Sequence, residues 1–243
     1  MKINICHLYP DVLNLYGDRG NVTALKKRLE WRGIEAQITN ANIGDKINAA
    51  DTDIFFIGGG QDFEQEVLLK DLATGKRDVI LDAVESGKVF LAICAGYQIM
   101  GKYYKTHTGE VCNFLGALDL YTVGQKKRMI GNYAYECTLG GKKVKITGFE
   151  NHSGKTYLGK GVEPLGKVLA GHGNNGEDGT EGARYKNVFA TYAHGPVLPK
   201  NPVFADALLS AALKNKYGDG TLSVLDDTFE NNANAYMLGR LLK

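Results

Sequence analysis

Short apolar runs alternate with amphipathic stretches over most of the chain. Runs such as Asp53–Ile57 and Val89–Ile93 are continuously apolar, as is typical of strands that are buried on both faces. The stretches between them have helical periodicity, and several end at a glycine, which is a common helix stop. The predicted strands are Lys2–Leu8, Ile34–Thr39, Asp53–Ile57, Val89–Ile93 and Val188–Ala193, and the predicted helices are Asn21–Arg32, Gln61–Leu72, Lys76–Ser86, Ile99–Lys102, Val203–Lys216 and Asn231–Leu242.

The pattern changes between Leu118 and Val168, where alternating residues predict antiparallel hairpins. Gly140-Gly141 marks one turn between two such strands. Alternation of strands and helices elsewhere predicts an α/β fold, with an open, mostly parallel sheet, helices on both faces and an added antiparallel hairpin region. No repeat, linker or low-complexity segment interrupts the chain, so we expect a single domain over residues 1–243.

Composition narrows the classes of function. The 243 residues include 29 basic and 27 acidic side chains, and this balance gives no electrostatic reason to expect nucleic acid or an acidic membrane as the main partner. The chain opens directly into a strand pattern rather than a signal peptide, and no apolar run is long enough to span a bilayer. We therefore expect a cytoplasmic protein with reduced cysteines. The four cysteines are too scattered for a C-x-x-C pair, and no metal site is expected: Cys6, Cys94, Cys112 and Cys137.

Cys94 is the strongest chemical signal. It lies directly after a predicted buried strand and before a helical segment, the setting of a nucleophile elbow. Such a turn exposes the sulfur at the edge of the sheet, and the positive end of a following helix favours a thiolate. The alternative is that Cys94 is a small buried hydrophobic residue, as we expect for Cys6 and Cys137.

Two further segments also follow predicted strands. Gly58-Gly59-Gly60 ends one strand, and His194 follows another. Carboxyl ends of parallel strands meet at one edge of a sheet, so we expect both segments to lie near Cys94. The amides of Gly60 and Ala95 would then form an oxyanion hole, and His194 would act as the base. The glycines could instead form only a tight turn.

Other histidines carry weaker signals. His7, His107 and His172 are interpreted as surface or core residues, whereas His152 either lines the pocket or shapes a turn. A phosphate-binding loop at the glycines is disfavoured because the Gly-x-x-x-x-Gly-Lys-Ser/Thr pattern is absent.

The segments around these residues resemble a known family. Cys94-Ala95-Gly96-Tyr97-Gln98, the triple glycine and the later TYAHGP are similar to class I glutamine amidotransferase domains of the cobyric-acid-synthase type, which have a flavodoxin-like fold. Within that type, the chain most resembles the glutaminase subunits of bacterial lipid II isoglutaminyl synthases. Four stretches spread over nearly the whole chain carry this likeness: Leu13–Asn21, Asp53–Gln65, Gly148–Tyr157 and Thr191–Pro202.

The resemblance implies a role for each matching residue. Cys94 would attack the side-chain amide of glutamine to form a thioester and release ammonia, and His194 would shuttle protons. Gly60 and Ala95 would supply the oxyanion hole. Gln98 would hold backbone groups of the substrate, and Arg128 would pair with its α-carboxylate.

One position departs from the family pattern. Most class I glutaminases carry a glutamate two residues after the histidine, and here that position is Pro196. We therefore expect either that a partner chain donates the acid or that a cysteine–histidine dyad suffices.

The resemblance also implies a partner. A Mur-ligase-like synthetase would form a heterodimer with this chain and would bind ATP and Mg²⁺, so no cofactor is expected here. That partner would activate the α-carboxylate of D-glutamate in the lipid II stem peptide, which ammonia then amidates during peptidoglycan synthesis. The surface that meets it is expected on Leu118–Val168 or the final helix.

Three other functions remain open from the sequence. The ammonia could serve another carboxylate acceptor, such as a corrinoid. The chain could be a stand-alone cysteine hydrolase or stress protein, although Gln98 and the triple glycine disfavour this. It could also be a catalytically silent binding subunit.

Overall fold

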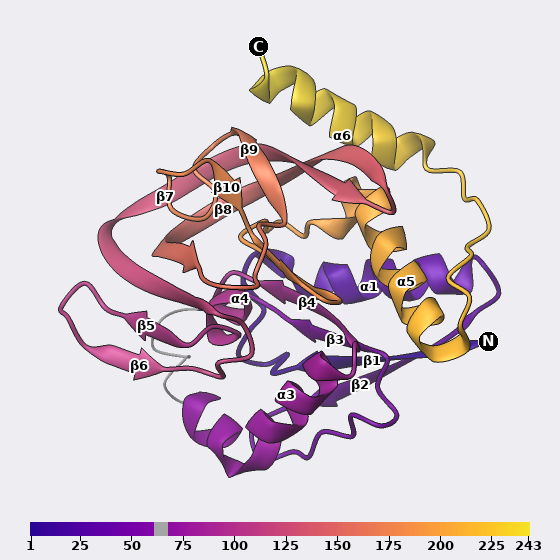
Figure 1. Ribbon diagram of the computed structural model, residues 1–243. Coiled ribbons are helices and arrows are strands. Elements are labelled where there is room, and N and C mark those ends of the chain that lie inside the picture. Colours follow the sequence, from indigo (N-terminus) through magenta and orange to yellow (C-terminus); the bar gives the residue numbers. More distant parts are fainter. Residues whose placement is uncertain (61–67) are drawn as a thin grey trace.

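A six-stranded, mostly parallel sheet forms the centre of the computed structural model, which describes residues 1–60 and 68–243 (Figure 1). The strand order is β11-β12-β4-β3-β1-β2, and only β11 at the edge runs antiparallel to its neighbour. The strands are β1 (Lys2–Leu8), β2 (Glu35–Ala41), β3 (Ile54–Ile57), β4 (Val89–Ile93), β11 (Ala183–Tyr185) and β12 (Val188–Thr191). The predicted α/β fold with a mostly parallel sheet is confirmed.

Helices cover both faces of this sheet. Figure 1 shows α1 and α5 on one side and α3 on the other. The direction of strand addition reverses between the β1–β2 and β3–β4 connections, and right-handed crossovers then put their helices on opposite faces. The helices are α1 (Arg19–Glu30), α3 (Arg77–Glu85), α4 (Ala95–Ile99), α5 (Pro202–Tyr217) and α6 (Thr228–Leu241).

Burial explains the apolar runs of the sequence. Every residue of β3 and β4 is buried, and the rings of Phe55 and Phe90 stack across the two strands with centroids 4.6 Å apart. Strands covered by helices on both faces have no polar side, so they read as continuous rather than alternating hydrophobic runs.

A second sheet holds the predicted hairpin region. The long strands β7 (Leu120–Leu139) and β8 (Lys142–Leu158) pair antiparallel around Gly140-Gly141, which confirms the predicted turn. Their register shifts between Gly124 and Met129, so residues 125–128 bulge out of the ladder. The remaining strands are β5 (Tyr103–Lys105), β6 (Val111–Asn113), β9 (Gly166–Ala170) and β10 (Thr180–Glu181).

The two sheets meet beside the predicted base. Phe149 of β8 and His194, just after β12, form an isolated antiparallel bridge with N···O distances of 3.2 and 2.8 Å. The hairpin region therefore contacts the carboxyl edge of the parallel sheet directly.

Most predicted elements are confirmed with small shifts at their ends. The helix predicted at Ile99–Lys102 is wrong: α4 begins directly after Cys94 and ends at Ile99. The chain leaves the helix there because the amide of Lys102 donates to the carbonyl of Leu120 at 2.8 Å, which starts the pairing of β5 with β7. The helix predicted at Gln61–Leu72 falls largely on residues 61–67, outside the described residues, and the chain is helical from Leu68 to Asp71.

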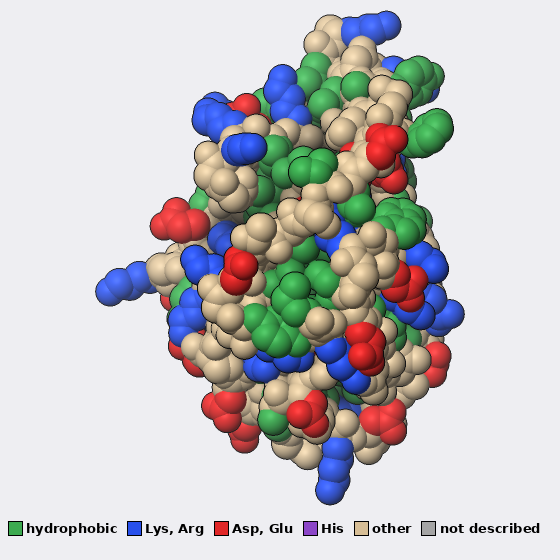
Figure 2. Space-filling model, turned by 90° about the vertical axis from the view of Figure 1, so that its right-hand side faces the viewer, with side chains coloured by type: hydrophobic (Ala, Val, Ile, Leu, Met, Phe, Trp, Pro, Cys, Tyr) green, Lys and Arg blue, Asp and Glu red, His purple; other side chains and the backbone are tan. Residues whose placement is uncertain are grey.

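The surface carries both signs of charge. Figure 2 shows basic, acidic and hydrophobic side chains interspersed on one face, in keeping with the near-neutral balance of the sequence. None of the helices within residues 1–60 and 68–243 has the length and apolar character needed to cross a membrane.

Candidate active site

Cys94 occupies the strained turn that the sequence predicts. Its backbone has φ 50° and ψ −102°, a conformation that is costly for a residue other than glycine, and α4 begins at the next residue. The amide of Cys94 donates to the carbonyl of Thr191 at 2.9 Å, which fixes the turn to the end of β12. The strand-to-helix elbow is thus present. However, α4 has only 5 residues, so its dipole contributes less to a thiolate than a long helix would.

His194 lies in the same buried site. Its side chain has 0% exposure, and its Nδ1 atom lies 3.1 Å from Oδ2 of Asp18. Burial lowers the pKa of the imidazole, but the charge of Cys94 and the hydrogen bond to Asp18 outweigh it and raise the pKa to about 10. His194 is therefore an imidazolium at neutral pH. A hydrogen bond with Cys94 also raises the pKa of this imidazole, and its buried Nε2 atom has no other partner among the described residues.

Asp18 is the acid that the sequence analysis did not find. Its carboxylate is fully buried, contacts Nδ1 of His194 and accepts the amide hydrogen of Gly59 at 2.8 Å. Both contacts orient it as the third member of a cysteine–histidine–aspartate triad. A carboxylate of this chain thus lies at the imidazole, which the sequence did not predict, and the alternatives of a partner-donated acid or a bare dyad remain predictions.

Pro196, two residues after His194, stands where the family pattern has a glutamate, and in this chain it has a packing role. Pro196 packs against Gly20 in the first turn of α1, where a Cβ on the glycine would lie 2.5 Å from Cγ of the proline. This contact holds the start of α1, and hence Asp18, against the segment that carries His194. Gly59 is needed for the same reason, because a Cβ there would lie 2.4 Å from Cε1 of His194.

The predicted oxyanion residues lie at adjoining strand ends. Gly60 follows β3 and Ala95 starts α4, and the two segments are joined by a hydrogen bond from the amide of Gly96 to the carbonyl of Gly58 at 3.2 Å. The amide of Gly59 is engaged by Asp18, so it is not a free donor. The structure thus brings Gly60 and Ala95 to the edge where Cys94 lies, and their role as oxyanion donors remains a prediction.

Gln98 lies one helical turn beyond Cys94 but belongs to a buried network. Its amide nitrogen donates to the hydroxyl of Tyr192 at 3.1 Å, and that hydroxyl also contacts Oγ1 of Thr156 at 2.6 Å. His152 stacks on the ring of Tyr192 with centroids 3.5 Å apart, and burial lowers its pKa. His152 is therefore a neutral, packed side chain beside the site, and substrate binding by Gln98 remains a prediction.

Arg128 reaches the site only through intermediaries. Its guanidinium donates from Nε to Oδ1 of Asn151 at 2.6 Å and from Nη2 to the Asn151 carbonyl at 2.8 Å. The amide of Asn151 donates in turn to the hydroxyl of Tyr16, whose ring packs edge-on against His194 with centroids 4.9 Å apart. The structure thus places Arg128 three contacts from the catalytic histidine, and its pairing with the α-carboxylate of glutamine remains a prediction.

Glu181 is a second residue that sequence reasoning missed. It is fully buried, and its Oε1 atom accepts hydrogen bonds from Oγ1 of Thr191 at 2.6 Å, the amide of Tyr192 at 2.9 Å and the hydroxyl of Tyr133 at 3.0 Å. These bonds hold Thr191 and Tyr192 in place. Thr191 accepts the amide hydrogen of Cys94, and the chain continues from there to His194. Burial raises the pKa of Glu181 to about 7, and its Oε2 atom has no partner among the described residues.

In the described ranges, no group of three or more histidine, cysteine, aspartate or glutamate side chains could hold a metal ion.

A strained cysteine, a charged histidine and a buried aspartate at the carboxyl edge of a parallel sheet define the class of cysteine-dependent amide hydrolases with an α/β fold. Residues 4–202 match the CobB/CobQ-like glutamine amidotransferase domain, and the chain belongs to that family. It is a glutamine amidotransferase.

Curated relatives agree with this assignment, and a solved structure matches the fold. The chain is 43% identical to the protein named lipid II isoglutaminyl synthase (glutamine-hydrolyzing) subunit GatD of Staphylococcus aureus, over 88% of this chain and 86% of the relative. It is 40% identical to the protein of the same name in Streptococcus pneumoniae, over 89% and 83%. A glutamine amidotransferase structure from Thermotoga maritima matches the fold with a TM-score of 0.56 at 14% identity, covering 98% of this chain and 94% of that one.

Replacing Asp18 with asparagine tests its role as the orienting acid. The substituted amide would lack the negative charge that supports the imidazolium, so we expect kcat for glutamine hydrolysis to fall about 10²-fold or more, with little change in KM. The alkaline limb of the kcat/KM profile should also move to lower pH, because the pKa of His194 falls. The exposed Asp11→Asn variant serves as a control. Wild-type kcat and an unchanged pH profile for Asp18→Asn would contradict the triad.

Replacing Glu181 with glutamine tests the buried carboxyl group. The ordinary pKa of 4.5 rises to about 7 in the folded protein, so the folded state holds a proton that the unfolded state has released between these values. The free energy of unfolding contributed by this group is therefore lost as pH rises through 7, by at most about 3 kcal/mol. Urea unfolding at pH 5.5 and 8.5 should show Glu181→Gln gaining stability relative to wild type at the higher pH. The exposed Glu163→Gln variant serves as the control. A stability difference between Glu181→Gln and wild type that is the same at both pH values would contradict the raised pKa of Glu181.

Proposed function

We propose that this chain is the glutaminase subunit of a lipid II isoglutaminyl synthase. It hydrolyses L-glutamine and supplies ammonia to a Mur-ligase-like partner, which amidates the α-carboxylate of D-glutamate in the peptidoglycan stem peptide. The observation that carries the glutaminase half is the buried arrangement of Cys94, His194 and Asp18. The identities of 43% and 40% over more than four fifths of the two GatD proteins support the choice of acceptor.

The geometry suggests a sequence of proton transfers. The thiolate of Cys94 attacks the side-chain carbonyl carbon of glutamine, and the amides of Gly60 and Ala95 stabilise the oxyanion. The imidazolium of His194 gives its Nε2 proton to the leaving nitrogen, so ammonia departs and a glutamyl thioester remains. His194 then takes a proton from water, whose oxygen attacks the thioester, and glutamate leaves as the thiolate–imidazolium pair re-forms. Asp18 keeps Nδ1 protonated throughout.

The partner supplies the energy-dependent half of the reaction. ATP and Mg²⁺ bind to that subunit in this proposal, and the pair works in the cytoplasm at the membrane-bound acceptor. We expect the partner to dock on the hairpin region or on α6, whose side chains are all at least partly exposed. Ammonia released at Cys94 would then pass to the synthetase.

An alternative acceptor has a specific observation in its favour. The chain is 29% identical to a probable cobyric acid synthase of Methanococcus maripaludis over 72% of this chain, but this covers only 36% of that protein. The match therefore extends over a part of a longer enzyme, whereas the GatD proteins match over most of their length. The corrinoid acceptor is accordingly the second candidate.

Replacing Cys94 with alanine in the complex with the synthetase tests the division of labour. Without the thiol, glutamine-dependent amidation of lipid II should fall to background, while amidation driven by high concentrations of ammonium chloride should be unchanged. Both rates can be followed by mass spectrometry of the amidated stem peptide, with Cys112→Ala as a control on a cysteine outside the site. Loss of both activities would show that Cys94 is not simply a glutaminase nucleophile. Amidation of a corrinoid but not of lipid II by the wild-type complex would reassign the acceptor.

A further inference from the structure

A cavity of about 850 Å³ lies between the β5–β6 hairpin and the bulged part of the β7–β8 ribbon. Its size is within the range of small-molecule sites. The triad residues are not among those that line it, and it shares only Arg128 with the predicted glutamine-binding residues. Its lining is rich in positive charge, from Lys105, Lys126, Lys127, Arg128 and Lys155, with His107 and His172 beside them.

The bulge in β7 is what gathers these cations. In a regular strand, consecutive side chains point to opposite faces, so three successive residues could not all face one cavity. The register shift between Gly124 and Met129 releases residues 125–128 from the ladder, and Lys126, Lys127 and Arg128 all line the same space. Because the β7–β8 hairpin is interrupted at this point, we regard the cluster as a specific feature of the fold and not as a chance run of basic residues.

Negative charge balances only part of this cluster, because Glu150 contacts His172 and Glu177 pairs with Lys155. No aspartate or glutamate is among the described residues that line the cavity. The guanidinium of Arg128 donates hydrogen bonds to the neutral Asn151, and Lys105, Lys126 and Lys127 make no ion pair with any described residue. Like charges collected around one cavity repel each other, and a bound anion would relieve that repulsion.

We propose that this cavity binds an anionic ligand through a diphosphate group. One arginine is enough to pair with a single carboxylate, such as that of glutamine. Four cations here lack a carboxylate partner, so they match a ligand that carries more negative charge than one carboxylate. Phosphate oxygens accept both the point charge of lysine and the planar donors of arginine. A diphosphate occurs in lipid-linked sugar carriers and in nucleotides, and this site would recognise the group common to both.

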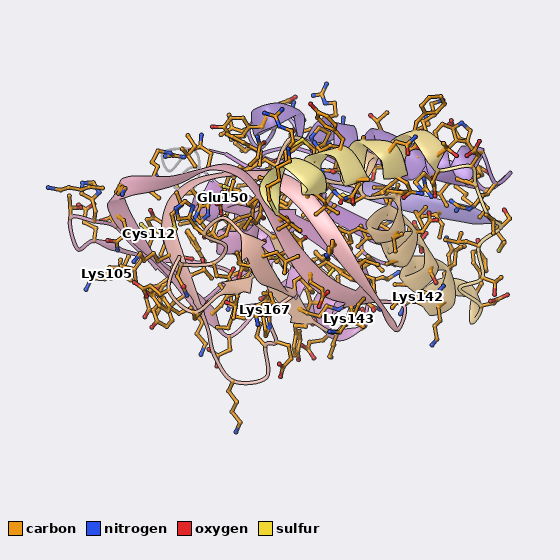
Figure 3. The ribbon with its side chains drawn as sticks, turned by 90° about the horizontal axis from the view of Figure 1, so that it is seen from above. Lys105, Cys112, Lys142, Lys143, Glu150 and Lys167 are labelled. Atoms are coloured by element: carbon orange, nitrogen blue, oxygen red, sulfur yellow. The ribbon has the colours of Figure 1, made fainter. Side chains whose placement is uncertain are left out.

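Calorimetric titration of the purified full-length chain with inorganic pyrophosphate tests the proposal. We expect saturable binding that weakens steeply with salt, and at least tenfold weaker binding of inorganic phosphate. The double variant Lys126→Ala/Lys127→Ala should bind pyrophosphate at least tenfold more weakly. Lys142→Ala/Lys143→Ala removes the same charge at the opposite end of the ribbon, where Figure 3 shows both lysines far from Lys105, and should bind like wild type.

The possible outcomes distinguish a lipid-linked diphosphate from a nucleotide, and both of these from the absence of a diphosphate site. Geranyl diphosphate binding more tightly than ADP would support a lipid-linked ligand, and the reverse order would support a nucleotide. No saturable heat with pyrophosphate, or equal weakening by the two double variants, would overturn the site. Glutamine hydrolysis measured on the same samples reports on the glutaminase independently, so this proposal can fail while the proposed function stands.

Discussion

The contact between Asp18 and His194 is the interaction on which the site depends. Burial alone would lower the pKa of His194, and the charge of Cys94 together with the carboxylate of Asp18, 3.1 Å away, raises it. The contact joins the start of α1 to the end of β12, two segments that are 176 residues apart in the chain. Gly20, Gly59 and Pro196 make it sterically possible, since a side chain on either glycine would separate the partners.

A second layer of contacts keeps this charged pair in place. Hydrogen bonds from Thr191 and Tyr192 to Glu181 fix one side of the Thr191–Ala193 segment. The bridge between Phe149 and His194 ties the next residues to β8. The antiparallel region is therefore part of the catalytic framework, because it supports the histidine directly. Gln98, Tyr192 and His152 form a buried, closely packed network beside the nucleophile.

The sequence predicted the nucleophile and base but not the acid. Cys94 and His194 follow buried strands, and the rule that parallel strand ends meet at one edge is enough to bring them together. Asp18 precedes a helix near the start of the chain, and no local pattern relates it to His194; only the crossing of α1 over the sheet does so. A search confined to the residue two positions after the histidine could not find it.

Other features also depended on tertiary structure. The strands, the hairpin turn at Gly140-Gly141 and most helices follow from hydrophobic periodicity and turn residues. Glu181 in a two-residue strand gave no sign that it would be fully buried, and the Lys126-Lys127-Arg128 run gave no sign of a bulge that brings three basic residues to the lining of one cavity. Burial and register are set by distant partners, so single-residue patterns do not reveal them.

The charge state of His194 tests the account most directly. Nuclear magnetic resonance of protein labelled with ¹⁵N-histidine reports the protonation of each imidazole as pH is varied. We predict that His194 is an imidazolium at pH 7.5 and titrates with a pKa of about 10, and that Cys94→Ser lowers this pKa because it removes the thiolate charge. A neutral His194 that titrates near its ordinary value of 6.5 would contradict the charged imidazole and the supporting role of Asp18.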